Sequence, residues 1–379
     1  EITTRLVGSE MCIRDSNFAA LKPSLLAQKA AGHTTGFEHQ NIDERLYPDK
    51  IFDQPQSIIA IALAYPAKIH ERPPRTGPKR GRFARASWGI DYHTVLDRKM
   101  ASLIKFIKRT AENDPNLRFK PMVDTGELID VVVAQRAGLG FIGKNGLLIT
   151  PEFGSYVYLG EIITNIKFAP DEPMTSQCGD CTRCIDFCPP KALLGDGRMN
   201  GQRCLSYQTQ TKGYMDPEFR PMIRNVLYGC DICQQVCPFN KGKDFHIHPE
   251  MEPDPETVLP ELIPMLTLTN KDFKTRFGKL AGAWRGKKPL QRNAIIALVN
   301  LHDRSAIPHL LEVIEHDPRP MIRATAAWAV GELQSSSNPE IETFLKTALA
   351  KETTPEAQVA FQDALDHLTQ PVSYTHLTL

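Results

Sequence analysis

Apolar residues in the first half of the chain form strand-like runs separated by helix-like stripes. Residues 57–65 are a continuous apolar run rich in β-branched side chains, which is typical of a strand buried on both faces. Residues 156–164 form a second such run, and residues 119–123 form a shorter one. Helical spacing of apolar positions fits residues 21–31, 91–108 and 129–137. The alternation predicts an α/β sheet domain over residues 17–165.

From residue 289 onward the pattern is purely helical and repeats itself. Residues 292–301 recur as residues 323–333, and a partner helix is expected between them at residues 306–315. A repeat built from helix pairs is the signature of HEAT-type arrays. We therefore predict an all-α, HEAT-like region at residues 289–371. Only about two pairs fit, so the array has to pack against the preceding domain.

The cysteines are concentrated in one segment, where eight of the nine lie between Cys178 and Cys237. The first run reads C-x2-C-x2-C-x3-C-P, the bacterial ferredoxin spacing for 4Fe–4S ligation. The second run begins at Cys204 and repeats that order with its first gap stretched. We predict a ferredoxin-like module with two 4Fe–4S clusters at residues 166–248. Short helices are expected after the cysteine runs, at residues 191–194 and 216–225.

Paired runs of this kind exchange ligands, because the fourth cysteine of each run binds the cluster of the other run. One cluster is therefore expected on Cys178, Cys181, Cys184 and Cys237. The other is expected on Cys188, Cys204, Cys230 and Cys233. A disulfide framework suits short secreted chains, and zinc sites usually pair cysteines across a longer spacer, so both alternatives fit less well. Thiolate clusters need a reducing compartment, which predicts a cytoplasmic protein.

Composition adds three limits. With 379 residues, 41% of them hydrophobic, the chain is long enough for two or three globular domains. The formal net charge is only +1, so nucleic-acid binding has to come from a local patch rather than from bulk charge. No apolar run approaches the ~18 residues of a membrane-spanning helix, so no membrane association is expected.

One local patch is basic. Residues 271–292 carry eight Lys or Arg side chains against one acid, with Phe273, Phe277 and Trp284 interleaved. Basic side chains suit phosphates and aromatic rings suit unstacked bases, so this stretch favours RNA. The alternative is a helix that packs its rings inward and leaves a solvated basic face. Most of the patch falls in a basic connecting segment at residues 249–288.

Both ends of the chain look foreign. Residues 1–16 and 372–379 resemble translated sequencing-adapter read-through, and we exclude them from the fold prediction. On this interpretation Cys12 has no role.

Two further stretches carry candidate chemistry. Residues 138–146 are rich in glycine, which allows close backbone approach to a ligand, but they match neither a P-loop nor a dinucleotide fingerprint. Asp124 stands at the end of a short predicted strand. Residues 91–96 fall one glycine short of the cobalamin-ligating D-x-H-x-x-G motif, so we interpret His93 as a helix-start residue rather than a metal ligand.

Together these features resemble the epoxyqueuosine reductase family. The double cysteine run is accompanied by Arg-Ala-Ser-Trp-Gly at 85–89, Val-Asp-Thr-Gly at 123–126, Gly-Lys-Asn at 143–145 and the helical tail. The resemblance implies a cobalamin-binding α/β domain akin to corrinoid dehalogenases, then the two-cluster module and HEAT repeats. It implies reduction of epoxyqueuosine to queuosine at the wobble position of tRNA with a GUN anticodon. It also implies a monomer that takes electrons from an unidentified low-potential donor.

The resemblance implies roles for single residues as well. Asp124 matches the family's proposed proton donor, and we expect burial under the cofactor to raise its pKa, with helix capping as the alternative role. Ala84 stands where some members carry a cysteine, so a catalytic thiol there is excluded. Cobalamin contacts are expected at Arg45, Ala84, Asp124, Lys144, Asn145, Ser155 and Ser206. Contacts to the tRNA anticodon stem-loop are expected at Lys212, Arg285, Lys287, Lys288 and Arg292.

Two other functions stay open on the sequence alone. Another corrinoid iron–sulfur reductase, such as a reductive dehalogenase, would typically lack the basic helical tail. A two-cluster electron-transfer protein would leave Asp124 and the glycine-rich loop without a role.

Overall fold

The computed structural model describes residues 7–11, 18–74, 76–334 and 337–369, and the chain forms two compact units. The first unit comprises Glu1–His70, Arg85–Tyr207 and Cys230–Pro253. The second unit comprises Glu71–Ala84, Gln208–Gly229 and Asp254–Leu379. In the described part of the chain, no helix has both the length and the apolar character needed to span a membrane.

The predicted adapter-derived ends lie mostly outside the described residues, and Cys12 lies outside them too. Within these ends only Val7–Met11 is described, and it forms strand β1 at the edge of a sheet. The origin of the two ends and the domain boundaries drawn from the sequence stay predictions.

Four strands form the sheet of the first unit, in the order β1-β2-β7-β4. Their bounds are Val7–Met11 (β1), Ser57–Ala64 (β2), Val157–Thr164 (β7) and Phe119–Met122 (β4). Every neighbouring pair is antiparallel, and β2 lies beside β7 with Ser57 opposite Thr164. All of β2 is buried, as its continuous apolar run predicts. The three expected strands are confirmed as β2, β4 and β7.

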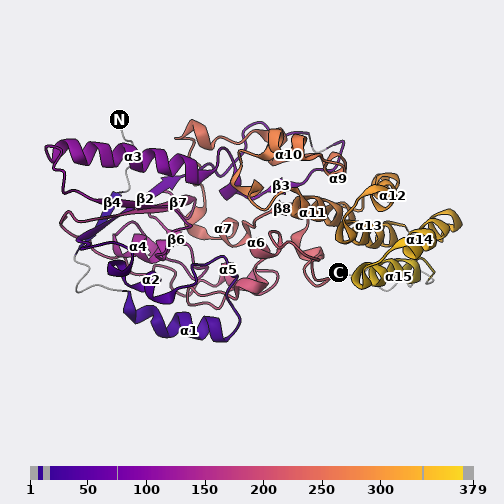
Figure 1. Ribbon diagram of the computed structural model, residues 1–379, viewed down its shortest axis with the longest axis horizontal. Coiled ribbons are helices and arrows are strands. Elements are labelled where there is room, and N and C mark those ends of the chain that lie inside the picture. The colour runs from indigo at the N-terminus through magenta and orange to yellow at the C-terminus, as the bar shows by residue number, and fades with distance from the viewer. Residues whose placement is uncertain (1–6, 12–17, 75, 335–336, 370–379) are drawn as a thin grey trace. The chain divides into compact units, whose positions relative to one another are not determined.

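Helices cover both faces of this sheet (Figure 1). Helix α3 (Tyr92–Thr110) packs on one face. The other face is covered by α1 (Lys22–Ala30), α2 (Ile42–Leu46) and α4 (Asp130–Arg136). Asp91 caps α3 by accepting the backbone N–H of His93, which explains why the helix begins there. The expected helices are confirmed to within two residues at each end.

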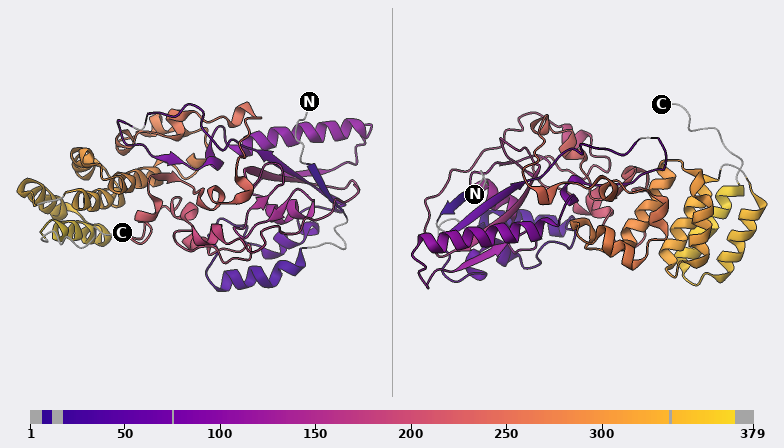
Figure 2. Two further views of the ribbon diagram at one scale, coloured as in Figure 1. Left: turned by 180° about the vertical axis from the view of Figure 1, so that it is seen from behind. Right: turned by 90° about the horizontal axis from the view of Figure 1, so that it is seen from above.

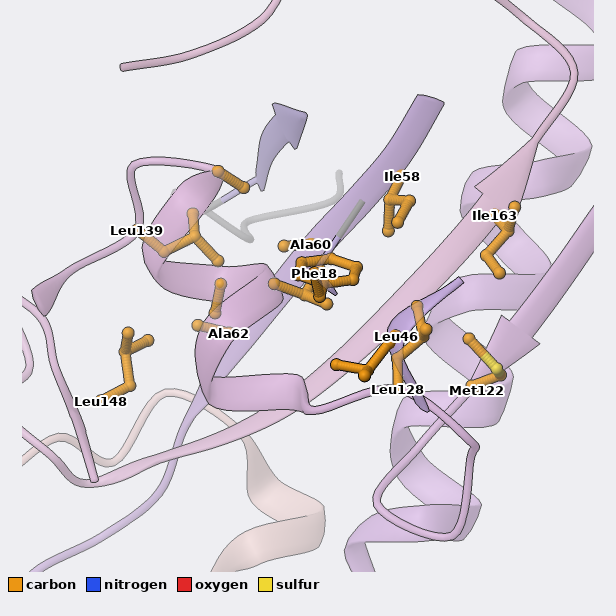
Figure 3. Close-up of a cluster of buried hydrophobic side chains, with 13 residues drawn as sticks. Phe18, Leu46, Ile58, Ala60, Ala62, Met122, Leu128, Leu139, Leu148 and Ile163 are labelled. Carbon is orange, nitrogen blue, oxygen red and sulfur yellow. The ribbon is translucent and has the colours of Figure 1, made fainter. Parts of the chain in front are cut away.

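The side chains of β2 divide between two cores, because successive strand residues point to opposite faces. Ile58, Ala60 and Ala62 belong to the core beneath α4 (Figure 3). Ile59 and Ile61 belong to the core beneath α3. Burial on both sides makes the sheet a rigid base for the loops that leave its strands.

The cysteine-bearing segment has little regular structure. Its helices are about one turn long and lie inside or next to the cysteine runs, at α5 (Arg183–Asp186), α6 (Leu205–Gln208) and α7 (Ile232–Gln235). The glycine-rich loop before this segment is a small hairpin between β5 (Phe141–Ile142) and β6 (Leu148–Ile149).

Both short helices expected after the cysteine runs are wrong. Residues 191–194 instead contribute a bridge between Leu193 and Met199. Within residues 216–225 only the 3₁₀ turn Pro221–Ile223 forms. Prolines at 217 and 221 lack the backbone N–H that a continuous helix needs, which accounts for the second failure.

The second unit contains a short parallel strand pair, β3 (Arg82–Phe83) and β8 (Val226–Tyr228), and several helices. The helices are α8 (Pro255–Val258), α9 (Ile263–Leu266), α10 (Asn270–Phe277), α11 (Lys287–Asn300), α12 (Ile307–His316), α13 (Pro320–Leu333), α14 (Pro339–Lys351) and α15 (Pro355–Thr369). The last five lie side by side (Figure 2). The expected repeat falls in α11 and α13 with α12 between them, which confirms the helical array.

Arg292 is completely buried in α11. Its guanidinium donates to the carbonyl oxygens of Gln208, Thr211 and Gly213 at 2.7–2.9 Å, and to the Thr211 hydroxyl at 2.9 Å. Burial lowers the pKa of Arg292 to about 10. These contacts hold residues 208–213 against α11, so the expectation that Arg292 contacts RNA does not fit its position.

Arg292→Met is therefore expected to destabilise the protein by about 3 kcal/mol, because several buried carbonyl acceptors lose their donor. Chemical denaturation checks this, with Arg304→Met at an exposed position as the matched control. Equal denaturation midpoints for the two variants would contradict the structural role of Arg292.

Candidate active site

Asp124 stands two residues beyond the end of β4, with an unusual backbone conformation. Its φ is +51°, in the left-handed region that residues other than glycine rarely adopt. The preceding Val123 is buried, whereas the Asp124 side chain is 60% exposed. The turn therefore takes the chain from the core to the surface within one residue and presents a carboxylate there.

His93 links Asp124 to the start of α3. Its Nδ1 lies 2.7 Å from Asp91 Oδ1, and its Nε2 lies 3.7 Å from Asp124 Oδ2. The imidazole also stacks on Tyr92, with ring centroids 4.2 Å apart. The sequence identified His93 only as a helix-start residue, because nothing local in it reveals a partner about 30 residues away.

The two carboxylates raise the pKa of His93 to about 9, and the interaction with Asp124 is the larger cause. The same interaction holds the pKa of Asp124 below its ordinary value. The expectation of a raised pKa for Asp124 is therefore wrong for this structure. The pair carries one proton at neutral pH, on the imidazole.

Stability should follow the charge of His93. A raised folded-state pKa means that the stabilisation is fully present below about pH 6.5 and is lost as the pH rises through about 9. His93→Gln is expected to cost on the order of 1 kcal/mol at pH 6 and less at pH 9.5, since the site is partly solvent-screened. Chemical denaturation at both pH values tests this, and His309→Gln on the exposed face of α12 is the control. A pH-independent difference would contradict the ion pair.

Two more acidic residues with shifted pKa values, Asp130 and Glu161, lie in the same unit. Glu161 is buried in β7, and Asp130 begins α4. Burial, aided by the charge of Asp124, raises the pKa of Asp130 to about 7. Burial and Asp130 raise the pKa of Glu161. Neither residue was among those predicted for the site, although a glutamate in the middle of an apolar strand run was a usable signal.

Four of the predicted cluster ligands surround one small cavity. The cavity is lined by the four cysteines, by residues of the β5–β6 hairpin and by the two residues after Cys237. These are Cys178, Cys181, Cys184 and Cys237, then Lys144, Asn145 and Ile149, and finally Pro238 and Phe239. Burial raises the pKa of Cys237, and the nearby thiols of Cys178 and Cys181 add to the rise. Cys237 thus lies with the first run, although it belongs to the second.

The other four cysteines form a second group. Burial raises the pKa of Cys204, with a contribution from Cys188. Burial also raises the pKa of Cys233, followed by the effects of Cys230, Cys204 and Cys188. All eight thiols are free of disulfides. Thiols crowded into two sets of four suit metal clusters, because coordination deprotonates a thiol outright.

The residues expected to contact cobalamin lie in different surroundings. Arg45 is half-buried on α2, burial lowers its pKa, and in the described structure its guanidinium donates no hydrogen bond. Lys144 Nζ donates to the carbonyl of Gly179 at 2.7 Å. Ser155 is buried, and its hydroxyl is already bonded to Gln234 and Asn240.

The remaining cobalamin candidates differ too. Asn145 lines the cysteine cavity, and Ser206 lies in α6 next to Cys204. Ala84 belongs to the second unit, where its N–H donates to the carbonyl of Tyr228. Among the candidates outside the cysteine cavity, Arg45 and Asp124 offer a guanidinium and a carboxylate to a corrinoid's amides or phosphate, so these residues fit such a cofactor.

Most of the expected RNA-binding residues gather in the second unit. Arg285, Lys287 and Lys288 line a cavity of about 550 Å³, together with His316 and Arg319. Trp284 is 54% exposed, and the centroid of its ring lies 4.6 Å from the Arg285 guanidinium carbon. Lys212 is exposed. A basic cavity beside an exposed ring offers both phosphate and base contacts.

Three family models match the chain. They are described as epoxyqueuosine reductase QueG, DUF1730, at residues 45–125, as a 4Fe-4S double cluster binding domain at residues 177–240, and as HEAT repeats at residues 285–366. The HEAT match agrees with the helical array, and the cluster match covers all eight cysteines.

Curated relatives and solved structures give the same picture. The epoxyqueuosine reductase of Listeria monocytogenes is 56% identical over 332 residues, 87% of each chain. That of Bacillus subtilis is 51% identical over 352 residues, 93% of this chain and 90% of the relative. A crystal structure of epoxyqueuosine reductase with an epoxyqueuosine-modified tRNA-Tyr stem loop has a TM-score of 0.92 at 49% identity, covering 97% of this chain and 96% of that one. The Streptococcus thermophilus enzyme has a TM-score of 0.89 at 47% identity, covering 96% and 95%. Because about half of its residues are shared with these proteins over nearly their whole length, the chain belongs to the epoxyqueuosine reductase family.

Proposed function

We propose that this chain reduces epoxyqueuosine to queuosine at the wobble position of tRNA with a GUN anticodon. The observation that carries the proposal is an exposed Asp124, paired with His93, in the same compact unit as two groups of four cysteines. The family membership supports the reaction, and the relative crystallised with a modified tRNA-Tyr stem loop supports the substrate.

The reaction breaks the two C–O bonds of an epoxide and forms a C=C bond. The oxygen leaves as water, so two electrons and two protons are taken up. When bound, cobalamin supplies the two-electron reductant and the 4Fe–4S clusters supply its electrons singly. We assign the clusters to the two groups of cysteines and assign Arg45 to an amide or phosphate of the corrinoid.

We assign Asp124 as the group that hands a proton to the leaving oxygen. At neutral pH the proton of the pair rests on His93, whose pKa is about 9, so His93 resupplies the Asp124 carboxylate. We assign the second proton to the carboxyl of Asp130, which feels the charge of Asp124 and whose pKa burial raises to about 7. A dehalogenase-like reaction is the weaker alternative, because it has no use for the basic, aromatic surface of the second unit.

We further propose that the chain works as a cytoplasmic monomer that accepts electrons from a low-potential donor. Free thiols in two sets of four need a reducing compartment, which supports the location.

Anaerobic turnover tests the proposed function. The chain is reconstituted with iron, sulfide and cobalamin, then given a low-potential reductant and tRNA containing epoxyqueuosine. Mass spectrometry of the nucleosides should show loss of one oxygen from the modified base. Product without cobalamin would overturn the corrinoid mechanism, and no product with all cofactors bound would overturn the substrate.

Binding of the tRNA should depend on Lys288. Lys288→Ala is expected to weaken binding of the anticodon stem-loop several-fold and to lower the slope of log affinity against log salt by about one. Fluorescence anisotropy at several salt concentrations measures both, with Lys351→Ala, exposed on α14, as the control. An unchanged slope would remove Lys288 from the phosphate contacts.

A further inference from the structure

Asn145 is a buried amide whose orientation is fixed by the chain around it. The residue is only 2% exposed and lies in the hairpin loop between β5 and β6. Its Oδ1 accepts the backbone N–H of Leu147 at 3.3 Å. Because a backbone N–H can only donate, the amide oxygen has to face Leu147, and the NH₂ group has to face the opposite way.

The NH₂ group of Asn145 has no acceptor among the described residues. Its nitrogen is enclosed and makes no hydrogen bond there, not even to a cysteine sulfur. An unsatisfied buried donor is costly and rare in folded proteins. The residue lines the cavity surrounded by Cys178, Cys181, Cys184 and Cys237, whose other walls include apolar Ile149 and Phe239. In such a cavity, sulfur is the acceptor that the NH₂ group of Asn145 can reach.

We propose that Asn145 donates an N–H···S hydrogen bond to a sulfide of the 4Fe–4S cluster on Cys178, Cys181, Cys184 and Cys237, and thereby raises the reduction potential of that cluster. The inference rests on the proposed ligand set and reassigns Asn145, which the sequence placed at cobalamin. Hydrogen bonds to cluster sulfurs are one of the factors that set such potentials. The reduced cluster carries one more negative charge, so the bond stabilises the reduced state more.

The effect of Asn145 falls on the cluster of the cysteine group whose cavity it lines. The cluster it contacts holds an electron more readily than it would in an apolar pocket of the same shape. A bond of ordinary strength corresponds to about a tenfold shift in the ratio of reduced to oxidised cluster at fixed potential, or about 59 mV for one electron.

A redox titration followed by EPR on the reconstituted full chain tests this. Asn145→Asp keeps the acceptor for Leu147 but loses the donor, and Asn145→Leu loses both. In each variant the midpoint of one cluster should fall by about 59 mV, the tenfold shift above, while the other cluster stays unchanged and serves as the internal control. Asn165→Leu removes an asparagine that bonds Arg118 and Asn116 at the end of β7, and both midpoints should stay unchanged.

Pulsed EPR on protein labelled with ¹⁵N-asparagine gives a second readout that needs no change in potential. Besides the coupling of the Asn240 backbone nitrogen, which bonds Cys237, the wild type should show a second ¹⁵N coupling to that reduced cluster, and Asn145→Asp should lose this second coupling. If the second coupling and both midpoints persist in Asn145→Asp, the inference is wrong while the cluster assignment stands. If Cys178→Ala leaves both clusters in place, the ligand set is wrong and the inference falls with it.

Discussion

Asp124→Asn is expected to lower the rate of epoxyqueuosine reduction by about 10²–10⁴-fold, the usual contribution of a positioned acid. The amide is nearly the same shape but cannot carry the proton that His93 supplies. Because Asp124 is exposed at the surface of its turn, the fold should tolerate the change. Single-turnover assays under anaerobic conditions measure the rate, and nucleoside mass spectrometry identifies the product.

Two observations make the Asp124 experiment decisive. The absorption spectra of the clusters and of bound cobalamin should be unchanged, so that the loss lies in proton transfer rather than in cofactor content. Asp49→Asn, at another exposed aspartate of the same unit, should keep full activity. Retention of more than half the wild-type rate in Asp124→Asn would exclude Asp124 as the proton donor.

Cys188→Ala is expected to halve the iron content, from about eight atoms to about four. The retained cluster should be that of Cys178, Cys181, Cys184 and Cys237, although Cys188 belongs to the same sequence run as the first three. Iron analysis and EPR of the reduced protein measure the content and the number of clusters.

Double variants distinguish shared ligation from one cluster per run. Cys188→Ala with Cys230→Ala should keep one cluster, because the structure groups both residues around the same site. Cys188→Ala with Cys178→Ala should lose both. If each run held its own cluster, the two outcomes would be exchanged, and Cys188 with Cys178 would leave one cluster intact.

Patterns with a fixed local period carried the fold prediction. In β2, and in the repeated helical stretch of α11 and α13, the spacing of apolar residues alone shows that the element is buried. The layers of the first unit and the helical tail could therefore be predicted. Cysteine spacing is equally local and predicted the two groups of thiols. The short helices near residues 191 and 216 were wrong because a local bridge between Leu193 and Met199 and the prolines at 217 and 221 override helical preference there.

The site predictions that were wrong concern residues whose surroundings depend on contacts with residues distant in the sequence. Arg292 has the composition of an RNA contact, but its helix packs on carbonyl groups some 80 residues earlier in the chain. The pKa of Asp124 falls rather than rises because of His93, a partner that no spacing rule connects to it. The surroundings of Asn145 likewise exist only after the hairpin has formed, so the sequence could name the residue but not the cavity that it lines.

The exchange of cysteines between the two groups has a consequence for assembly. In this arrangement the cluster on Cys178, Cys181, Cys184 and Cys237 closes a loop of roughly 50 residues and bears an entropic cost of about 3–4 kcal/mol. That closure also brings Cys188 close to Cys230 and Cys233, so the second cluster has only Cys204 left to recruit and bears less of the cost. Iron loading should therefore be cooperative, with half-loaded protein scarce at intermediate iron supply, and oxidative loss of one cluster should leave the other as a template for repair.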